Sequence, residues 1–337
     1  MPPPSLLFGE EAGKPRVELR NDAWRPHQDI TLPICYRNTP WALALAHALG
    51  FGIYREGGLV QLFDEPDLWS DIGYEIIDGA PAPGEHVVLR RGEHSYPPFF
   101  PKLLLANDAV QCLVFPDETS QARNVADAIY RNISSDELEP SDILVIFPDP
   151  LTVADRAAPL VKELWAKNVN AHIAGITSSR DQFFVEHSVA ITGIFRAKGN
   201  EAPIVYVLDG QYCHRGSELL RKRNTLFTAI TRSRAWVRVC GYGEAMLKLK
   251  SEIDAVVSHN YQLAFDVPTP EQLSTLRRIH RDMTPEDRKR LGKAKDSAQE
   301  LLEQLEAGEL SIEHLPEEVR RRLTRLFSHQ GESRDAK

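Results

Sequence analysis

The clearest structural signal in this chain is Ile191-Thr-Gly-Ile-Phe-Arg-Ala-Lys-Gly-Asn-Glu201, followed by the apolar run Ile204 to Leu208. A second segment, Asn224-Thr-Leu-Phe-Thr-Ala-Ile-Thr-Arg-Ser-Arg234, precedes a similar run from Trp236 to Cys240. Short, continuous apolar runs are typical of strands that are buried on both faces of a parallel sheet. Each segment also has a glycine, a carboxylate or an arginine where a strand or helix ends, and open α/β sheets bind ligands at such positions.

From Val110 onward, apolar runs alternate with amphipathic stretches. The expected strands are Cys112 to Phe115, Ile143 to Phe147, Ala171 to Ala174 and Val189 to Ile194, and the expected helices are roughly Ser120 to Ile133, Val153 to Lys167 and Leu226 to Thr231. Strands that alternate with helices imply a parallel sheet with right-handed crossovers. The sequence therefore predicts an α/β fold with a parallel sheet flanked by helices over residues 30–262.

Three further regions surround this sheet. Residues 1–29 are proline-rich and polar, which predicts a poorly ordered lead-in. Residues 51–110 predict a small irregular insertion, and its strand-like pieces are Leu59 to Phe63, Tyr74 to Ile77 and Val87 to Leu89. After Pro268 the composition shifts towards Glu, Lys, Arg and Leu, so residues 269–330 are expected to form a charged helical tail, folded as a hairpin.

The sequence around Thr39 predicts the first helix. Thr39 followed by Pro40 is typical of a helix start, because a proline at the first helical position wastes no hydrogen-bond donor. The helix is expected from Trp41 to Leu49, ending near Gly50. The apolar run from Ile30 to Tyr36 before it is expected to be a strand.

Composition sets broad limits on function. The chain has 337 residues, with 40 basic against 48 acidic side chains and a net charge of −8, so it lacks a whole-chain basic footprint for nucleic acid. A local basic surface remains compatible with that total. The 4 cysteines are scattered without metal-ligand spacing, and no metal site is expected. The sequence has neither a long apolar span nor a signal-peptide pattern, so a cytoplasmic protein without membrane contact is expected.

Several polar residues near these element ends are candidates for binding an anionic ligand. Arg37 follows the expected first strand and could reach into a cleft or remain on the surface. Gly199 would let the backbone approach a phosphate, and Glu201 could accept hydrogen bonds from ribose hydroxyls, although an ordinary polar turn is the alternative. Arg232 could stabilise a transferred phosphoryl group, an effect worth roughly 10³–10⁵ in rate. Its alternative is a solvated helix end.

Taken together, three segments resemble the C-terminal motor lobe of superfamily-one helicases of the UvrD/Rep type. Cys35-Tyr36-Arg37-Asn38 looks like the fourth motif of that family, Phe195 to Glu201 like the fifth and Phe227 to Arg234 like the sixth. The likeness covers about residues 30 to 245. It implies a RecA-like parallel sheet flanked by helices, with the small irregular β-containing insertion and the C-terminal helical hairpin as additions.

The resemblance also implies a role at each matching position. Tyr36 would stack on the adenine of ATP, and Arg37 would approach the γ-phosphate. Gly199 would offer backbone near the phosphates, and Glu201 would bind the ribose. Arg232 would act as the arginine finger.

Two positions carry less definite expectations. Lys198 matches a lysine of the family motif, but no specific contact can be assigned to it. Phe195 replaces a family histidine that touches nucleic acid, and Asn200 replaces an apolar residue. Phe195 could still stack on a base of a single strand, or it could belong to the core.

The groups that would complete an ATPase are absent from these 337 residues. No G-x-x-x-x-G-K-[ST] occurs, and Gly9-Glu-Glu-Ala-Gly13-Lys14 is one residue too short. Asp117-Glu118 follows an apolar strand as a magnesium motif would, but Asp117 is better interpreted as a helix start. ATP would therefore need a Walker-motif lobe supplied in trans or missing from this chain, and that lobe would hold Mg²⁺. Too few residues separate Ala171 from Val189 for the accessory domain usual at that point.

The leading hypothesis is the C-terminal lobe of a UvrD-like ATP-dependent helicase that acts on single-stranded DNA or RNA and is nearly inactive alone. The alternative is a non-catalytic module that binds nucleic acid or protein through the arginine cluster Arg320, Arg321, Arg322 and Arg325. A Rossmann-type enzyme is disfavoured because its glycine fingerprint is absent.

Overall fold

The computed structural model describes residues 34–63, 68–216 and 218–280. All of them belong to the first of the two units into which the chain divides, Met1–Arg281 and Asp282–Lys337. The expected lead-in over residues 1–29 and the tail beyond residue 280 lie outside the described residues. None of the helices in the described ranges is long and apolar enough to cross a membrane.

A six-stranded sheet with the order β3-β8-β7-β4-β6-β5 forms the centre of the described unit. Its strands are β3 (Val110–Phe115), β4 (Ile143–Phe147), β5 (Ala171–Ile173), β6 (Val189–Gly193), β7 (Ala202–Val207) and β8 (Ser233–Tyr242). Every adjacent pair is parallel. This confirms the expected α/β fold, and a parallel sheet flanked by helices is consistent with a RecA-like lobe.

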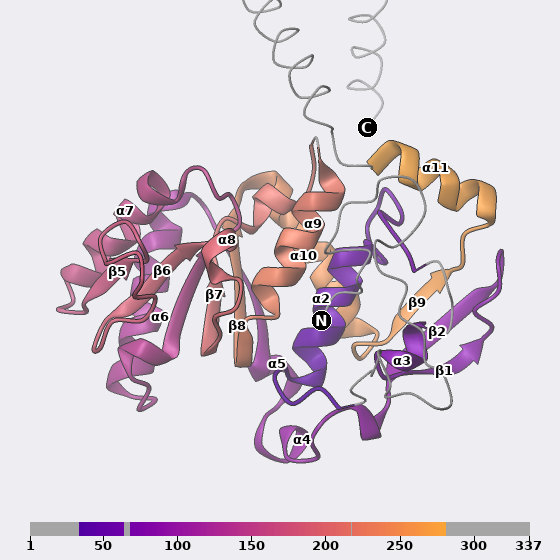
Figure 1. Cartoon of the computed structure of the whole chain (residues 1–337), viewed down its shortest axis with the longest axis horizontal. Coiled ribbons are helices and arrows are strands. Elements are labelled where there is room, and N and C mark those ends of the chain that lie inside the picture. The colour runs from indigo at the N-terminus through magenta and orange to yellow at the C-terminus, as the bar shows by residue number, and fades with distance from the viewer. Residues whose placement is uncertain (1–33, 64–67, 217, 281–337) are drawn as a thin grey trace, which may run out of the picture. The chain divides into compact units, whose positions relative to one another are not determined.

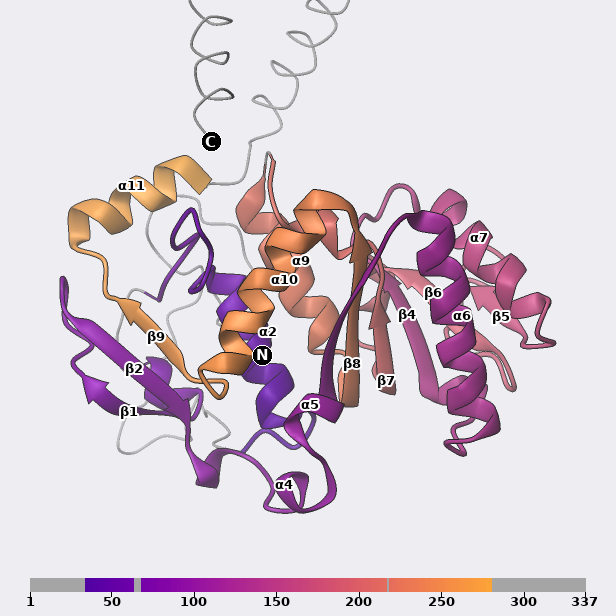
Figure 2. The same cartoon turned by 180° about the vertical axis from the view of Figure 1, so that it is seen from behind.

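Helices cover both faces of this sheet (Figures 1 and 2). One face packs against α6 (Glu118–Ser134) and α7 (Val153–Trp165), and the other against α2 (Pro40–Phe51), α9 (Leu219–Ile230) and α10 (Gly243–Ser258). In β4, Ile143, Val145 and Phe147 pack in the core on the side of α6 and α7. Leu144 and Ile146 pack in the core on the side of α2, α9 and α10. The strand is buried at every position because both of its faces are covered.

A smaller antiparallel sheet with the order β1-β2-β9 lies beyond α2 and α10 (Figure 1). It contains β1 (Tyr74–Gly79), β2 (His86–Arg91) and β9 (Leu263–Asp266). The first two strands confirm the β-containing insertion. The third strand was not predicted, because its partner in the insertion is far away along the chain and only the tertiary fold brings the two together.

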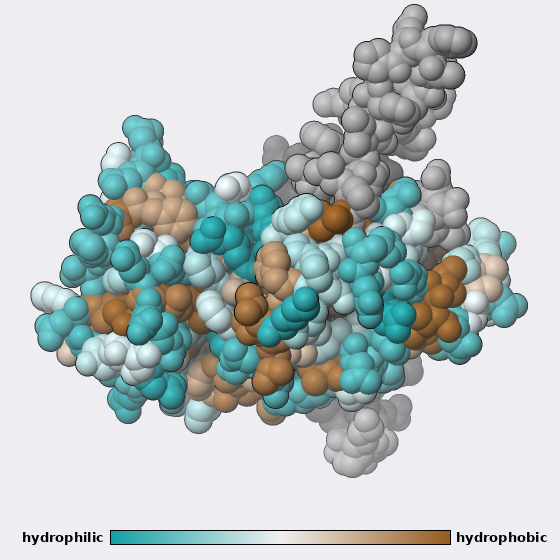
Figure 3. All heavy atoms as spheres, turned by 90° about the horizontal axis from the view of Figure 1, so that it is seen from below, coloured by the Kyte–Doolittle hydropathy of each residue, from teal (hydrophilic) through white to brown (hydrophobic). Residues whose placement is uncertain are grey.

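Short elements complete the described part of the chain. They are α3 (Leu68–Asp71), η1 (Glu93–Ser95), α4 (Phe100–Leu103), α5 (Ala106–Ala109), η2 (Pro140–Asp142), α8 (Ile194–Ala197), η3 (Gly210–Cys213) and α11 (Pro270–His280). Around α4, apolar side chains are exposed at Phe99, Leu103 and Leu105. Figure 3 views the face on which α4 lies, and hydrophobic residues gather near its middle among hydrophilic ones.

The first helix begins as predicted. Thr39 accepts a hydrogen bond from Ala42 N at 3.3 Å, and Pro40 occupies the first turn of α2. The helix runs to Phe51 and ends at Gly52, whose φ of 74° is left-handed. This position, two residues past the predicted end, favours glycine because a Cβ is strained there.

Two strand predictions differ from the structure. Residues 34–36 are not part of a strand, so the expectation that Tyr36 ends one was wrong, and the rest of that predicted strand, residues 30–33, lies outside the described residues. Leu59 to Phe63 also lack strand structure. Val60 N instead donates to Phe51 O at 2.8 Å, and the Val60 side chain is buried. The apolar residues of this run therefore cover the end of α2 instead of pairing in a sheet.

Other predicted boundaries differ more modestly. The strand expected from Val189 to Ile194 ends at Gly193, because Ile194 begins the unpredicted turn of helix α8. The expected helix over Leu226 to Thr231 is the second half of α9. Asp117 caps α6 and accepts a hydrogen bond from Ser120 N at 2.7 Å, which confirms its interpretation as a helix start.

Candidate functional site

Three chain segments meet where β7 and β8 begin. Glu201 directly precedes β7, and Arg232 directly precedes β8. The two strands pair with Ala202 opposite Ser233, and Ala202 N donates to Arg232 O at 3.1 Å. Strand pairing therefore brings Glu201 and Arg232 to the same edge of the sheet. This is the edge of the strands' amino ends, not the carboxyl ends at which open α/β sheets usually bind ligands.

Arg37 joins this edge from the other end of the chain. It lies just before α2, and its Nε forms an ion pair with Glu201 Oε2. The side chains are 49% and 33% exposed, so solvent reaches the pair and a ligand could compete for either partner. The structure thus brings together Arg37, Glu201 and Arg232, the three residues to which the family resemblance gives roles at the γ-phosphate, the ribose and the transferred phosphoryl group.

The environment of Arg232 is cationic overall. Its Nε donates to Thr228 O at 3.1 Å, which holds the side chain along the last turn of α9. Burial lowers the pKa of Arg232, the charge of Arg37 lowers it further, and Glu201 opposes both effects. Two guanidinium groups beside a single carboxylate leave an excess positive charge, which favours an anionic ligand.

Asn38 connects the segment of Arg37 to the segment of Arg232 by hydrogen bonds. The residue is 5% exposed, and its Nδ2 donates to Thr231 O at 3.1 Å and to Ser233 O at 2.7 Å. The two acceptors are the residues on either side of Arg232. The sequence predicts no role for Asn38, because a single asparagine before a helix carries no sign of a distant partner.

The turn before Glu201 explains its glycine. Gly199 has a φ of 93°, which other residues rarely adopt, and a Cβ there would meet nothing within 4 Å. The glycine is therefore needed for the backbone conformation, and the space in front of it is open. Asn200 Nδ2 donates to Arg196 O at 3.1 Å, and this bond satisfies a carbonyl at the end of α8.

Tyr36 and Lys198 are exposed near these segments. Tyr36 is 72% exposed. Neither side chain makes a hydrogen bond or an ion pair among the residues that the structure describes. Both are therefore accessible to a ligand, but their positions assign no contact.

Phe195 lies near the opposite, carboxyl edge of the sheet. It belongs to α8, which begins where β6 ends, and the residue is 64% exposed. The alternative that Phe195 is a core residue is therefore wrong. The guanidinium carbon of Arg221, on the first turns of α9, lies 5.8 Å from the ring centroid. An exposed aromatic ring with an arginine over it is typical of surfaces on which nucleic-acid bases stack.

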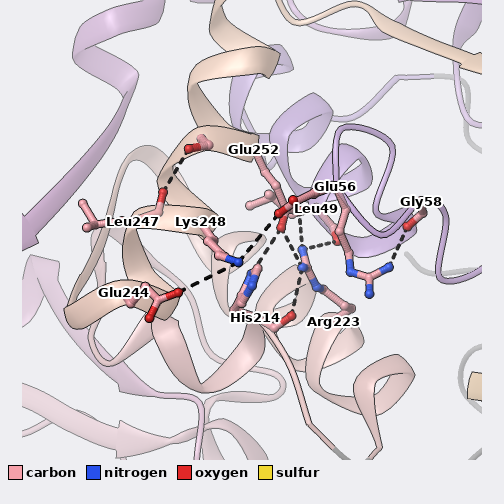
Figure 4. A network of polar contacts seen from close by, with 11 residues as sticks. Leu49, Glu56, Gly58, His214, Arg223, Glu244, Leu247, Lys248 and Glu252 are labelled. Carbon is pink, nitrogen blue, oxygen red and sulfur yellow. Dashed lines mark hydrogen bonds and ion pairs between the residues drawn. The ribbon is translucent and has the colours of Figure 1, made fainter. Parts of the chain in front are cut away.

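The helix α9 connects both edges, because Arg221 lies near its start and Arg232 follows its end. A buried polar network fixes its position (Figure 4). Arg223 on α9 contacts Glu252 on α10 and the carbonyl of Leu49 on α2. Among the described residues, no group of three or more His, Cys, Asp or Glu side chains could hold a metal ion.

Part of this site lies in a segment that is similar to a known protein family. Residues 187–240 match the family model of the UvrD-like helicase C-terminal domain. The resemblance to a C-terminal helicase lobe is confirmed. The matched residues include Phe195, Glu201 and Arg232 but not Arg37 or Asn38, which the fold brings to them. No curated protein sequence matches the chain.

Solved structures show partial similarity. The C-terminal domain of a possible DNA helicase from Lactobacillus plantarum WCFS1 is 18% identical, with a TM-score of 0.33, over 42% of this chain and 80% of that one. Arterivirus nonstructural protein 10, a helicase, in complex with DNA is 13% identical, with a TM-score of 0.25, over 42% of this chain and 32% of the viral protein. A second structure of it is 14% identical, with a TM-score of 0.25, over 53% and 44%. The chain thus spans less than half of the viral helicase.

Proposed function

We propose that this chain is the C-terminal motor lobe of a UvrD-like, ATP-dependent helicase. It would supply the arginine finger, a ribose contact and part of a single-strand track to a motor of two lobes. The observation that carries the proposal is the cluster of Arg37, Glu201 and Arg232, formed from three distant segments at one sheet edge.

The residues at this edge fit a nucleoside triphosphate. Two guanidinium groups suit a polyphosphate because planar arginine donors match phosphate oxygens. A half-exposed carboxylate can accept hydrogen bonds from ribose hydroxyls, and the exposed ring of Tyr36 can stack on a base. The open space beside Gly199 leaves room for the backbone to face a phosphate.

The ion pair between Arg37 and Glu201 implies an exchange on binding. Each partner would leave the other, Arg37 for a phosphate oxygen and Glu201 for a ribose hydroxyl. Arg232 would then stabilise the charge that develops on the transferred phosphoryl group. Arginine fingers of this kind contribute roughly 10³–10⁵ in rate, so their loss is readily measured. Magnesium and the phosphate-cradling loop would come from a Walker-motif lobe.

The opposite edge would contact nucleic acid. The exposed ring of Phe195, with Arg221 over it, offers a stacking surface and a positive charge to a single strand. Stacking of this kind depends little on sequence, because every base has a π-face. The proposal therefore assigns nucleotide and nucleic acid to opposite edges of one sheet, with α9 between them.

The test combines the chain with a Walker-motif lobe from the same source and measures phosphate release on single-stranded DNA. Arg232→Ala is expected to lower the reconstituted rate by at least about 10³-fold. Arg234→Ala is the matched control, because this exposed arginine lies two residues further along, in β8. Equal rates for the Arg232→Ala variant and the unsubstituted chain would refute the arginine-finger assignment.

The second candidate function, a non-catalytic interaction module, rests on the arginine cluster of the tail, which lies outside the described residues. It predicts a salt-dependent shift in the electrophoretic mobility of single-stranded DNA, and this shift should be lost when residues 270–337 are removed. Retention of the shift by the truncated chain would argue against this module.

A further inference from the structure

Asn38 is adjacent to Arg37, and its side-chain amide hydrogens bind the backbone on both sides of Arg232. Its Oδ1 accepts a local hydrogen bond from Cys35 Sγ at 4.0 Å. We infer that Asn38 is a positioning residue that fixes the separation of Arg37 and Arg232. The inference rests on the proposed function, since a nucleotide is the ligand that would need both guanidinium groups. It goes beyond that function because neither the sequence motifs nor the matched domain gives Asn38 a task.

The side-chain amide uses both of its hydrogens across the fold. One hydrogen bond goes to Thr231 O at 3.1 Å, and the other goes to Ser233 O at 2.7 Å. These carbonyls bracket Arg232, so the amide fixes the backbone on both sides of that residue. Ala202 N binds the carbonyl of Arg232 itself at 3.1 Å. Three consecutive carbonyls are thus held by two segments that are remote in sequence.

Asn38 is not needed to start its own helix. Thr39 performs that task, because its Oγ1 accepts from Ala42 N at 3.3 Å. Asparagine commonly caps helices with its side chain, but here the side-chain amide binds the backbone at the junction of α9 and β8. A purely local role therefore does not account for this residue.

The acceptors explain why the position requires a double donor. Carbonyls at the end of a helix lack intrahelical partners, and Thr231 lies just beyond the end of α9. Both Thr231 and Ser233 are buried, and buried carbonyls need a hydrogen-bond donor. An asparagine amide supplies two N–H groups from one nitrogen, which a serine or an aspartate cannot do.

The two hydrogen bonds from Asn38 to Thr231 O and Ser233 O, here called the Asn38 clamp, also restrain Arg37 through the backbone. Asn38 and Arg37 are adjacent, so their Cα atoms are about 3.8 Å apart. Arg37 and Arg232 repel each other, as the lowering of the Arg232 pKa by Arg37 indicates. Two like charges stay close only where the surrounding structure holds them, and Asn38 provides that restraint at the backbone of both residues.

The experiment compares Asn38→Ala and Asn38→Asp with Thr39→Ala in the full chain. Thr39→Ala is the matched control, because it removes a helix cap next to Asn38 without touching Thr231 or Ser233. Three quantities are measured for each variant. They are the melting temperature, the NMR signals of the arginine Nε–H groups of Arg37 and Arg232, and the affinity for a fluorescent ATP analogue in the presence of a Walker-motif lobe. Arg37→Lys and Arg232→Lys assign the two signals.

All three variants are expected to melt earlier than the unsubstituted chain. Only the Asn38 variants should shift both arginine signals in the absence of nucleotide. They should also weaken analogue binding by at least about tenfold, which corresponds to the loss of one hydrogen bond between a guanidinium group and the analogue. Asn38→Ser keeps one donor and should give intermediate shifts. It also serves as the informative variant if Asn38→Ala does not fold.

The outcomes separate the two proposals. Unchanged arginine signals in a folded Asn38 variant would overturn the positioning role, whatever the melting temperature. Shifted signals together with an analogue affinity of the Walker-motif lobe that the unsubstituted chain does not change would support the positioning role and count against the proposed function. Equal affinity of the unsubstituted and Asn38→Ala chains, with measurable binding, would also overturn the inference.

Discussion

Arg223 on α9 and Glu252 on α10 form a two-point ion pair in the core. Arg223 Nη1 donates to Glu252 Oε2 at 2.6 Å and Nη2 donates to Oε1 at 2.8 Å, while the two side chains are 0% and 4% exposed. Nη1 also donates to Leu49 O at 3.2 Å and Nη2 to His214 O at 3.3 Å (Figure 4). The pair thus ties α9 to α10, to α2 and to the turn after η3.

Breaking this pair from one side should destabilise the chain strongly. Arg223→Met leaves a buried carboxylate without its main partner, and such a loss typically costs about 3–5 kcal/mol. The double variant Arg223→Met, Glu252→Leu leaves no buried charge and should recover part of that loss. Urea unfolding of the chain measures both. A single variant as stable as the double variant would contradict the expected coupling.

The same pair should make stability depend on pH in acid. Burial opposes ionisation of Glu252, but His214 and Arg223 face the carboxylate and outweigh burial, so the pKa of Glu252 lies below its ordinary value of 4.5. A carboxyl with a lowered pKa in the folded state stabilises that state above the ordinary pKa. This stability is lost as the pH falls from about 4.5 through the folded pKa.

Urea unfolding at a series of pH values between 6 and 3 tests this expectation. The chain should lose stability most steeply in the lower half of that range. Glu252→Gln cannot ionise, so its curve should be flatter there. Parallel curves for the two proteins would show that other carboxyls cause the acid sensitivity.

Phe195→Ala should weaken binding of single-stranded nucleic acid without unfolding the chain. The ring is exposed, so its removal costs little core packing. Base stacking on an aromatic side chain contributes about 1–3 kcal/mol, which corresponds to a loss in affinity of roughly five- to 150-fold. Fluorescence polarisation of a labelled oligonucleotide measures this loss. Trp165→Ala, at an exposed aromatic residue that ends α7, is the control and should leave affinity unchanged.

Two glycine substitutions should have opposite effects on stability. Gly199→Ala places a Cβ at a φ of 93° and should destabilise by more than about 1 kcal/mol, because L side chains rarely adopt this conformation. Gly50→Ala lies inside α2, where alanine is favoured over glycine by about 1 kcal/mol. Its Cβ would meet Phe227 at 3.5 Å, an ordinary contact. Thermal unfolding compares the two, and equal shifts would contradict the role given to the Gly199 backbone.

Local patterns predicted much of the main sheet. The apolar run Ile143 to Phe147 coincides with β4, and the alternation of strands and helices indicated parallel pairing. Thr39-Pro40 and Asp117 marked helix starts that the structure confirms. These successes share a physical reason. Burial on both faces, cap hydrogen bonds and proline geometry act within a few residues, so they are visible in the sequence.

Predictions failed where distant segments decide the outcome. The run Leu59 to Phe63 is apolar enough for a strand, yet Val60 packs at the end of α2 and pairs with no strand. The strand β9 forms because it pairs with the edge of β2, and the residues Leu263–Asp266 alone do not predict that pairing. Phe195 could not be assigned to surface or core until the path of α8 was known.

The amino-acid sequence by itself determined which residue types stand at the motif positions, including Arg37, Glu201 and Arg232, and where most strands of the large sheet lie. Tertiary structure alone decided that these three residues meet at the amino ends of β7 and β8, that Asn38 clamps the backbone around Arg232, and that Arg223 finds Glu252. The difference is one of range. Backbone preferences and caps depend on neighbours along the chain, whereas ion pairs and clamps between remote segments exist only once the sheet and its helices have packed.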